Sequence, residues 1–236
     1  MVLPLYLAMT AAEISGCIPV PAHCAYMACQ FSPYTEGLTN LPESLPEGAM
    51  LILNDRMPCS GHSADLVVHQ LQRIVDRWNC ESILLDFQRP PEPKSIGLTR
   101  KIADSLSVPV AVTEAFAADL PSPVLLSPAP LHIPLSDYLH SWQSREIWLE
   151  VGFSQEEIVI SKTGAHITPR FPADGLSGGF YDKELCCQYQ IKPNPEEASF
   201  TLFDTWVTLK DKLNLAHSLG VVRAVGIYQE LGDFLK

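Results

Sequence analysis

Short apolar runs recur along the chain, separated by stretches rich in charged residues, proline or glycine. Uninterrupted apolar runs of this kind are typical of strands that are buried on both faces, as in a parallel sheet. The pattern predicts strands at eight places: residues 3–9, 24–31, 49–54, 82–87, 108–113, 123–126, 146–151 and 222–228.

Helical periodicity lies between several of these runs. After Ser63, a residue type that caps helices, apolar residues recur at the spacing of one helical face. Strand and helix therefore alternate, which is typical of a parallel α/β fold, and we expect a (β/α)8 TIM-type barrel. The predicted helices cover residues 63–78, 95–106 and 206–219, the last one ending before Gly220.

Two regions depart from the alternation. Five prolines between residues 19 and 46 leave room only for short early helices or loops. Between residues 146 and 171, three apolar runs separated by polar turns predict a small antiparallel meander. We therefore expect one barrel domain over residues 1–236, with an inserted β-rich segment at 152–198.

Charge narrows the classes of partner. The chain has 236 residues, of which 47% are apolar, and this is enough for one large core. Its formal net charge is -11 and it contains no Lys/Arg-rich run. Nucleic acids and anionic membranes require a cationic face, so neither is an expected partner. A small neutral or cationic ligand is favoured.

The cysteines and the N-terminus indicate a reducing compartment. The seven cysteines are odd in number and include no C-x-x-C pair, so we expect reduced, mostly buried thiols. The apolar N-terminus lacks the basic region of a signal peptide, and no other apolar run nears transmembrane length. We expect a cytoplasmic protein without a metal or cofactor; its oligomeric state stays open.

The segment around residue 86 has the features of a strand that ends at a functional rim. The run Ser82–Phe87 is followed by polar residues and two prolines, which mark the point where the chain leaves the sheet. Asp86 and Gln88 are two positions apart and should point the same way. In a barrel, active sites lie at this carboxyl end of the strands.

With these residues in view, the chain resembles the chitinase-like barrels of family 18 glycoside hydrolases, especially the compact spore-cortex branch. The first matching segment, Ile83–Pro90, is similar to the family's fourth strand with its motif D-x-x-D-x-E. The second, Ser199–Gly232, is similar to an aromatic strand, a helix and the eighth strand, which ends in Trp-x-Leu-Gly in the family. The resemblance also implies a small β-rich insertion late in the barrel.

The departures from the family pattern bear on activity. The resemblance implies that the glutamate of the motif donates a proton while the preceding aspartate orients the substrate acetamide. The aspartate is retained as Asp86, but Gln88 occupies the acid position and Ile83 the first aspartate position. The sugar-stacking tryptophan of the eighth strand corresponds to Gln229. An amide cannot donate a proton at neutral pH, so the inherited reaction is not expected.

Other acids follow the predicted strands and can meet at the barrel rim. Two carboxylates about 5–10 Å apart would allow a different glycosidase mechanism. The alternative is that these acids are solvated or paired with arginines. The candidates are Asp55, Glu114, Glu150 and Glu230, with Glu13 a weaker member.

Three further patterns could indicate function, but we expect the residues that form them to be ordinary loop or core residues. Gly175-Leu-Ser177-Gly-Gly179 fits G-x-S-x-G, yet it lacks the strand and helix that a nucleophile elbow needs. Cys59 and His62, with Cys24 or His23, have no diagnostic metal spacing. The tryptophans 142, 148 and 206 are possible sugar platforms, although we expect core packing for Trp148 and Trp206.

Three functional hypotheses follow. The leading one is a catalytically degenerate family 18-like protein that binds a carbohydrate or small polar ligand at the rim through Asp86, Gln88, Gln229 and Glu230. Asp55, Glu150 and Tyr228 are further candidate ligand-binding residues. The second is an active hydrolase with Glu114 or Glu230 as acid/base and Asp86 as nucleophile or orienter. The third is a non-catalytic scaffold or interaction protein.

Overall fold

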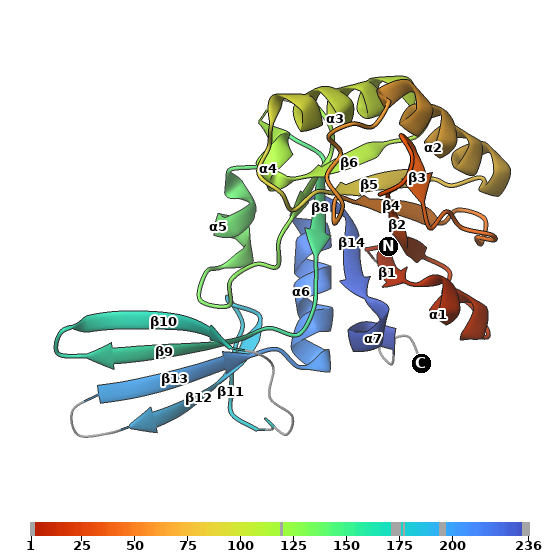
Figure 1. Cartoon of the computed structure of the whole chain (residues 1–236). Helices are drawn as coiled ribbons and strands as arrows, with labels where there is room; N and C mark the ends of the chain where they lie inside the picture. Colours follow the sequence, from red (N-terminus) through yellow and green to blue (C-terminus); the bar gives the residue numbers. More distant parts are fainter. Residues whose placement is uncertain (1–2, 119, 171–175, 177, 194–196, 233–236) are drawn as a thin grey trace. The chain divides into compact units, whose positions relative to one another are not determined.

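Eight strands form a closed barrel in the computed structural model, which describes residues 3–118, 120–170, 176, 178–193 and 197–232 (Figure 1). The strand β1 pairs in parallel with both β14 and β2, and these pairings close the ring. All eight predicted strand positions are confirmed. The barrel strands are β1 (Leu5–Met9), β2 (Cys24–Phe31), β4 (Met50–Asn54), β5 (Ser82–Asp86), β6 (Val110–Thr113), β7 (Val124–Leu126), β8 (Ile147–Glu150) and β14 (Val221–Ile227).

The interior of the barrel is filled by alternate residues of these strands. Side chains alternate along a strand, so every second residue points inward. The resulting core receives at least one buried side chain from each of the eight strands. It consists of Tyr6, Ala8, Ala25, Met50, Ile52, Leu84, Ala111, Leu125, Trp148 and Val225.

Two long helices of the barrel unit match the prediction. The helix α2 (Ala64–Trp78) begins at Ser63, whose hydroxyl accepts a hydrogen bond from Leu66 N at 3.4 Å, and it ends at the left-handed Asn79. The helix α3 (Pro93–Ser105) packs beside it. The expected short early element is α1 (Ala11–Gly16). Further short elements are β3 (Leu38–Thr39), α4 (Glu114–Ala117) and α7 (Tyr228–Leu231).

The chain divides into two compact units. The barrel unit comprises residues 4–126, 145–150 and the segment from 222 onward, while the second unit comprises mainly residues 127–144 and 151–221. The prediction of one domain over residues 1–236 stays a prediction. None of the described helices has the length and apolar character needed to cross a membrane.

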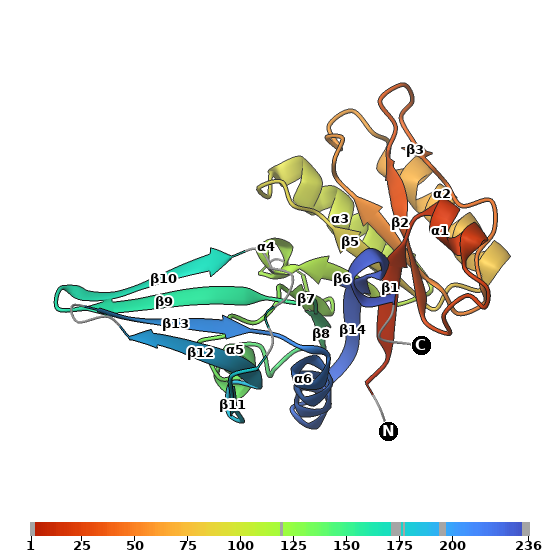
Figure 2. The same cartoon turned by 90° about the horizontal axis from the view of Figure 1, so that it is seen from below.

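The second unit contains an antiparallel five-stranded sheet and two helices. Figure 2 shows its longer strands side by side. The last two runs of the meander predicted between residues 146 and 171 form an antiparallel hairpin over residues 155–170, but the first run, at 146–151, forms barrel strand β8. In order across the sheet, the strands are β10 (Gly164–Arg170), β9 (Gln155–Ser161), β13 (Glu197–Phe203), β12 (Cys187–Pro193) and β11 (Phe180–Asp182); the helices are α5 (Leu135–His140) and α6 (Trp206–Ser218).

The helix α6 differs from its prediction in one respect. Leu209, Leu213 and Ala216 are buried as expected, but Trp206 is 42% exposed and stacks edge-on against Phe153, with 4.5 Å between ring centroids. As the first residue of the helix, Trp206 lies beyond the end of the buried stripe.

Candidate functional site

A cavity of about 140 Å³ opens at the carboxyl end of the barrel. Asn54, Asp86 and Glu150 are the last residues of β4, β5 and β8, and all three line this cavity. Each continues an inward-facing row of its strand, because Ile52, Leu84 and Trp148, two residues earlier in each case, lie in the barrel core. The remaining lining residues are Ala8, Met27, Ile52, Arg56, Leu84, Gln88, Leu125, Val225, Gly226 and Ile227.

Asp86 and Gln88 lie together at this cavity, as the sequence predicts. The carboxyl end of the barrel, where the cavity opens, is called the barrel mouth below. The Gln88 side-chain amide donates to Asp86 Oδ1 with a distance of 2.5 Å between Nε2 and Oδ1. One carboxylate oxygen of Asp86 is thereby occupied by a neutral donor. At neutral pH this pair can bind and orient a polar group, but Gln88 cannot supply a proton.

Asp55 has a different place from the one predicted. It is only 7% exposed, and its carboxylate accepts the backbone amides of Gln88 and Arg89, both at 2.9 Å. In return, the Arg89 guanidinium donates to the carbonyls of Asp55 and Arg56, both at 2.9 Å. Asp55 is absent from the cavity lining formed by the described residues. It fastens the loop after β5 to the loop after β4 and so positions Gln88.

Asn54 lines the cavity in place of Asp55, and the sequence analysis did not identify it. Its side-chain amide donates to the carbonyls of Cys29 at 2.9 Å and Met27 at 3.2 Å. These carbonyls belong to an irregular part of β2, where the pairing with β4 shifts register. The available signal was strand parity, because Asn54 continues the inward row Met50, Ile52 whereas Asp55 does not.

Glu150 is a half-buried acid that lines the cavity. Burial, followed by the nearby charges of Asp86 and Glu230, raises the pKa of the Glu150 carboxyl above its ordinary value. Glu150 is therefore near enough to two other predicted rim acids, Asp86 and Glu230, to interact with their charges. A carboxyl whose pKa is raised in a cavity is suited to hold a proton or to attract a cation.

The other predicted rim residues do not line this cavity in the described part of the chain. Glu114 begins the short helix α4. Gln229 donates from its amide to the carboxylate of Glu13, and the Tyr228 hydroxyl donates to Cys17 Sγ at 3.4 Å. Gln229 and Tyr228 thus connect α7 with α1 and its following loop.

None of the remaining sequence candidates lines this cavity in the described part of the chain. Residues 175 and 177 of the G-x-S-x-G motif lie outside the described residues. Cys59 and His62 line a separate groove, and no group of three His, Cys, Asp or Glu residues among those described could hold a metal ion. Trp148 is fully buried in the barrel core, as predicted, and its indole donates to Glu146 Oε1 at 2.9 Å.

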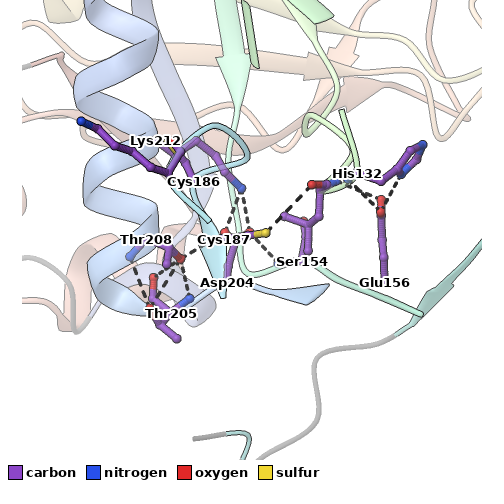
Figure 3. Close-up of polar contacts among 11 residues, drawn as sticks. His132, Ser154, Glu156, Cys186, Cys187, Asp204, Thr205, Thr208 and Lys212 are labelled. Carbon is purple, nitrogen blue, oxygen red and sulfur yellow. Dashed lines mark hydrogen bonds and ion pairs between the residues drawn. The ribbon is translucent and has the colours of Figure 1, made fainter. Parts of the chain in front are cut away.

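The second unit holds a separate polar network, shown in Figure 3. The Lys212 ammonium lies 2.8 and 2.9 Å from the two carboxylate oxygens of Asp204, and both side chains are more than nine-tenths buried. The Ser154 backbone amide also donates to Asp204, at 3.2 Å. Nearby, His132 Nδ1 lies 2.7 Å from Glu156 Oε2. These contacts join α6 and the loop before α5 to the sheet, and they are structural.

No protein-family model matches this sequence, and no curated protein matches it. Solved structures do match by fold. The family 18 chitinase of Cycas revoluta, in complex with (GlcNAc)4, shares 12% identity with a TM-score of 0.62 over 98% of this chain and 97% of that one. A family 18 N-acetylglucosaminidase from Paenibacillus barengoltzii shares 8% identity, with a TM-score of 0.58 over 99% and 98%.

The spore cortex-lytic enzyme SleL of Bacillus cereus shares 12% identity, with a TM-score of 0.57 over 95% of this chain and 70% of that one. At such identities the likeness establishes the fold. This chain has a TIM-type barrel of the kind found in family 18 glycoside hydrolases, with an additional antiparallel sheet.

Proposed function

We propose that this protein is a catalytically degenerate relative of family 18 glycoside hydrolases that binds a carbohydrate or another small polar ligand at the barrel mouth. The observation that carries the proposal is the pair formed by Gln88 and Asp86, joined by a 2.5 Å hydrogen bond at the edge of the cavity. By resemblance, this is where the family has its proton donor beside its orienting aspartate.

The chemistry of the amide supports loss of the inherited reaction. A positioned general acid contributes roughly 10²–10⁴-fold to the rate, and a glutamine contributes none of this. The family mechanism uses the substrate's own acetamide as nucleophile, so it holds no second protein acid in reserve. Asp86 retains its capacity to accept a hydrogen bond from a ligand, because Gln88 donates to Oδ1 and the carboxylate has a second acceptor oxygen, Oδ2.

The dimensions of the cavity limit how much of a ligand it can enclose. Its volume of about 140 Å³ is below the ~300–1,000 Å³ of pockets that enclose a whole small molecule. One substituent or the end of a sugar chain would enter, with the remainder lying outside. A double mutant of the Cycas revoluta chitinase, in which one replacement is glutamine for glutamate, is solved in complex with (GlcNAc)4, which supports carbohydrate binding by a barrel of this fold that carries such a glutamine.

The test combines binding and hydrolysis. Isothermal titration with (GlcNAc)4 and a reducing-end assay would be applied to the wild-type protein, to Gln88→Glu, and to Gln143→Glu as a control. Gln143 is exposed, belongs to the second unit and is absent from the described cavity lining, so its variant carries the same charge change at a residue that does not line the cavity. We expect wild-type binding without turnover, and turnover in Gln88→Glu alone. Robust hydrolysis by the wild-type protein would overturn the degenerate assignment.

A second candidate is an active hydrolase that uses other rim carboxylates. The raised pKa of Glu150 beside Asp86 and Glu230 favours it, because paired acids in unlike environments divide the roles of acid and base. In this version Glu150 would take the place of the predicted Glu114 or Glu230 as the proton donor. Hydrolysis by the wild-type protein that Glu150→Gln abolishes and Gln88→Glu leaves unchanged would establish it.

A further inference from the structure

The barrel mouth has an unequal set of charges. Asp86 and Glu150 line the cavity, Glu230 lies close enough to raise the pKa of Glu150, and Arg56 is the cation among the described lining residues. Two lining carboxylates against one guanidinium leave a formal charge of -1, which becomes -2 when Glu230 is counted. Arg56 is exposed, so solvent screens its charge more than that of the half-buried Glu150.

Glu150 stands where a neutral ligand would be poorly accommodated. It continues the row of the fully buried Trp148, and the barrel interior beneath it is apolar. An uncharged group that displaced water from this carboxylate could donate a hydrogen bond to it but would leave its charge uncompensated. A cation in the same position would offset the burial and the repulsion from Asp86 and Glu230 together.

Hydrogen-bonding capacity points the same way. Asp86 lines the cavity and accepts one bond from Gln88 through Oδ1, and its other oxygen is a further acceptor. Glu150 adds two carboxylate oxygens. A protonated primary amine has three N–H donors and one positive charge, so it matches this group of acceptors. An acetylated amine has one N–H and no charge.

We propose that the mouth selects an amino sugar with a free, protonated amine over its N-acetylated form, and that Glu150 is the residue that determines this preference. The inference rests on the proposed function, because it names the ligand class of the same cavity. It accords with the size of the cavity, which admits one substituent of a sugar.

The test compares tetramers of glucosamine and of N-acetylglucosamine by isothermal titration against the full chain at neutral pH. We expect the glucosamine tetramer to bind at least about tenfold more tightly, as a charge-assisted bond to a partly buried carboxylate would give. Raising the salt concentration should weaken glucosamine binding and leave N-acetylglucosamine binding nearly unchanged.

Two variants and one further ligand complete the design. Glu150→Gln should remove the preference, while Glu184→Gln, at an exposed position of the second unit, should keep it. Spermidine, a free polyamine, should bind more weakly than the glucosamine tetramer; equal binding would mean recognition by charge alone and would overturn the amino-sugar assignment. Equal or tighter binding of the N-acetylated tetramer overturns the inference but retains the proposed function. Binding of neither tetramer overturns the inference together with the carbohydrate form of the proposed function.

Discussion

Replacing Asp55 with alanine should destabilise the barrel and displace Gln88 at once. The Asp55 carboxylate accepts two backbone amides, those of Gln88 and Arg89, each at 2.9 Å, and only 7% of the residue is exposed. Alanine removes both acceptors. The loop after β5 then loses its attachment to the loop after β4, apart from the bonds that the Arg89 guanidinium donates to backbone carbonyls.

The magnitude follows from these bonds. A hydrogen bond to a charged group contributes about 1.5–3 kcal/mol net. Gln88 and Arg89 are exposed, so water can reach their freed amides and the lower value applies to each. We therefore expect Asp55→Ala to lower the free energy of unfolding by about 3 kcal/mol. Asp55→Asn keeps one acceptor oxygen and should lose about half as much.

Urea denaturation followed by tryptophan fluorescence measures this loss. The control is Asp65→Ala on α2, where an acid with an 87% exposed side chain lies 3.3 Å from Lys101. A surface pair of this kind contributes about 0–1 kcal/mol. Titration of Asp55→Ala with (GlcNAc)4 should show weaker binding as well, because Gln88 is no longer held. The reasoning is refuted if Asp55→Ala costs no more than Asp65→Ala.

Three other predictions concern separate parts of the molecule. Lys212→Met leaves Asp204 buried without its counter-ion, so it should lower the free energy of unfolding, measured by urea denaturation, by about 3–5 kcal/mol. Adding Asp204→Leu to this variant should recover part of the loss, and no recovery would contradict the ion-pair explanation. The raised pKa of Glu150 means that the folded protein binds its proton more tightly than the unfolded chain, so this group costs stability progressively as pH rises from the ordinary glutamate pKa through the raised value. Glu150→Gln should therefore unfold at a higher urea concentration than wild type at neutral pH and at the same concentration in acid. A variant less stable than wild type at neutral pH would contradict the raised pKa of Glu150. Gly220→Ala places a side chain at φ +92° and should cost about 1–2 kcal/mol, whereas the helical Gly97→Ala should stabilise, both by thermal denaturation; equal effects would exclude backbone strain as the cause.

The elements of the fold were predictable because their signals are local. A buried strand is a short apolar run, and a helix shows a 3.6-residue period between a capping residue and a terminator. The runs at 24–31 and 49–54 became β2 and β4 nearly residue for residue, and Ser63 became the cap of α2. The run at 146–151 was ambiguous, because nothing within it says whether its partners lie in the barrel or in the inserted sheet.

The site was predictable only where one strand determines it. Asp86 and Gln88 come from the same strand end, so their alternation indicated that they would meet. Asp55 was predicted to bind ligand, but side chains alternate along the strand, so Asn54 lines the cavity and the next residue, Asp55, does not. Gln229, predicted at a sugar-stacking position, instead donates to Glu13, which belongs to the first helix.

The sequence alone determined the order of strands and helices, the barrel class and the presence of an amide two residues after Asp86, since each depends on residues that are close together in the chain. Only the tertiary structure decided which acids share a cavity. Asp86 and Glu150 are the ends of barrel strands separated by β6 and β7. Closure of the ring brings both residues to one cavity. There, the burial of Glu150 and, to a smaller extent, the charge of Asp86 raise the pKa of the Glu150 carboxyl. Proximity across a barrel depends on pairings between distant segments, and no local pattern records them.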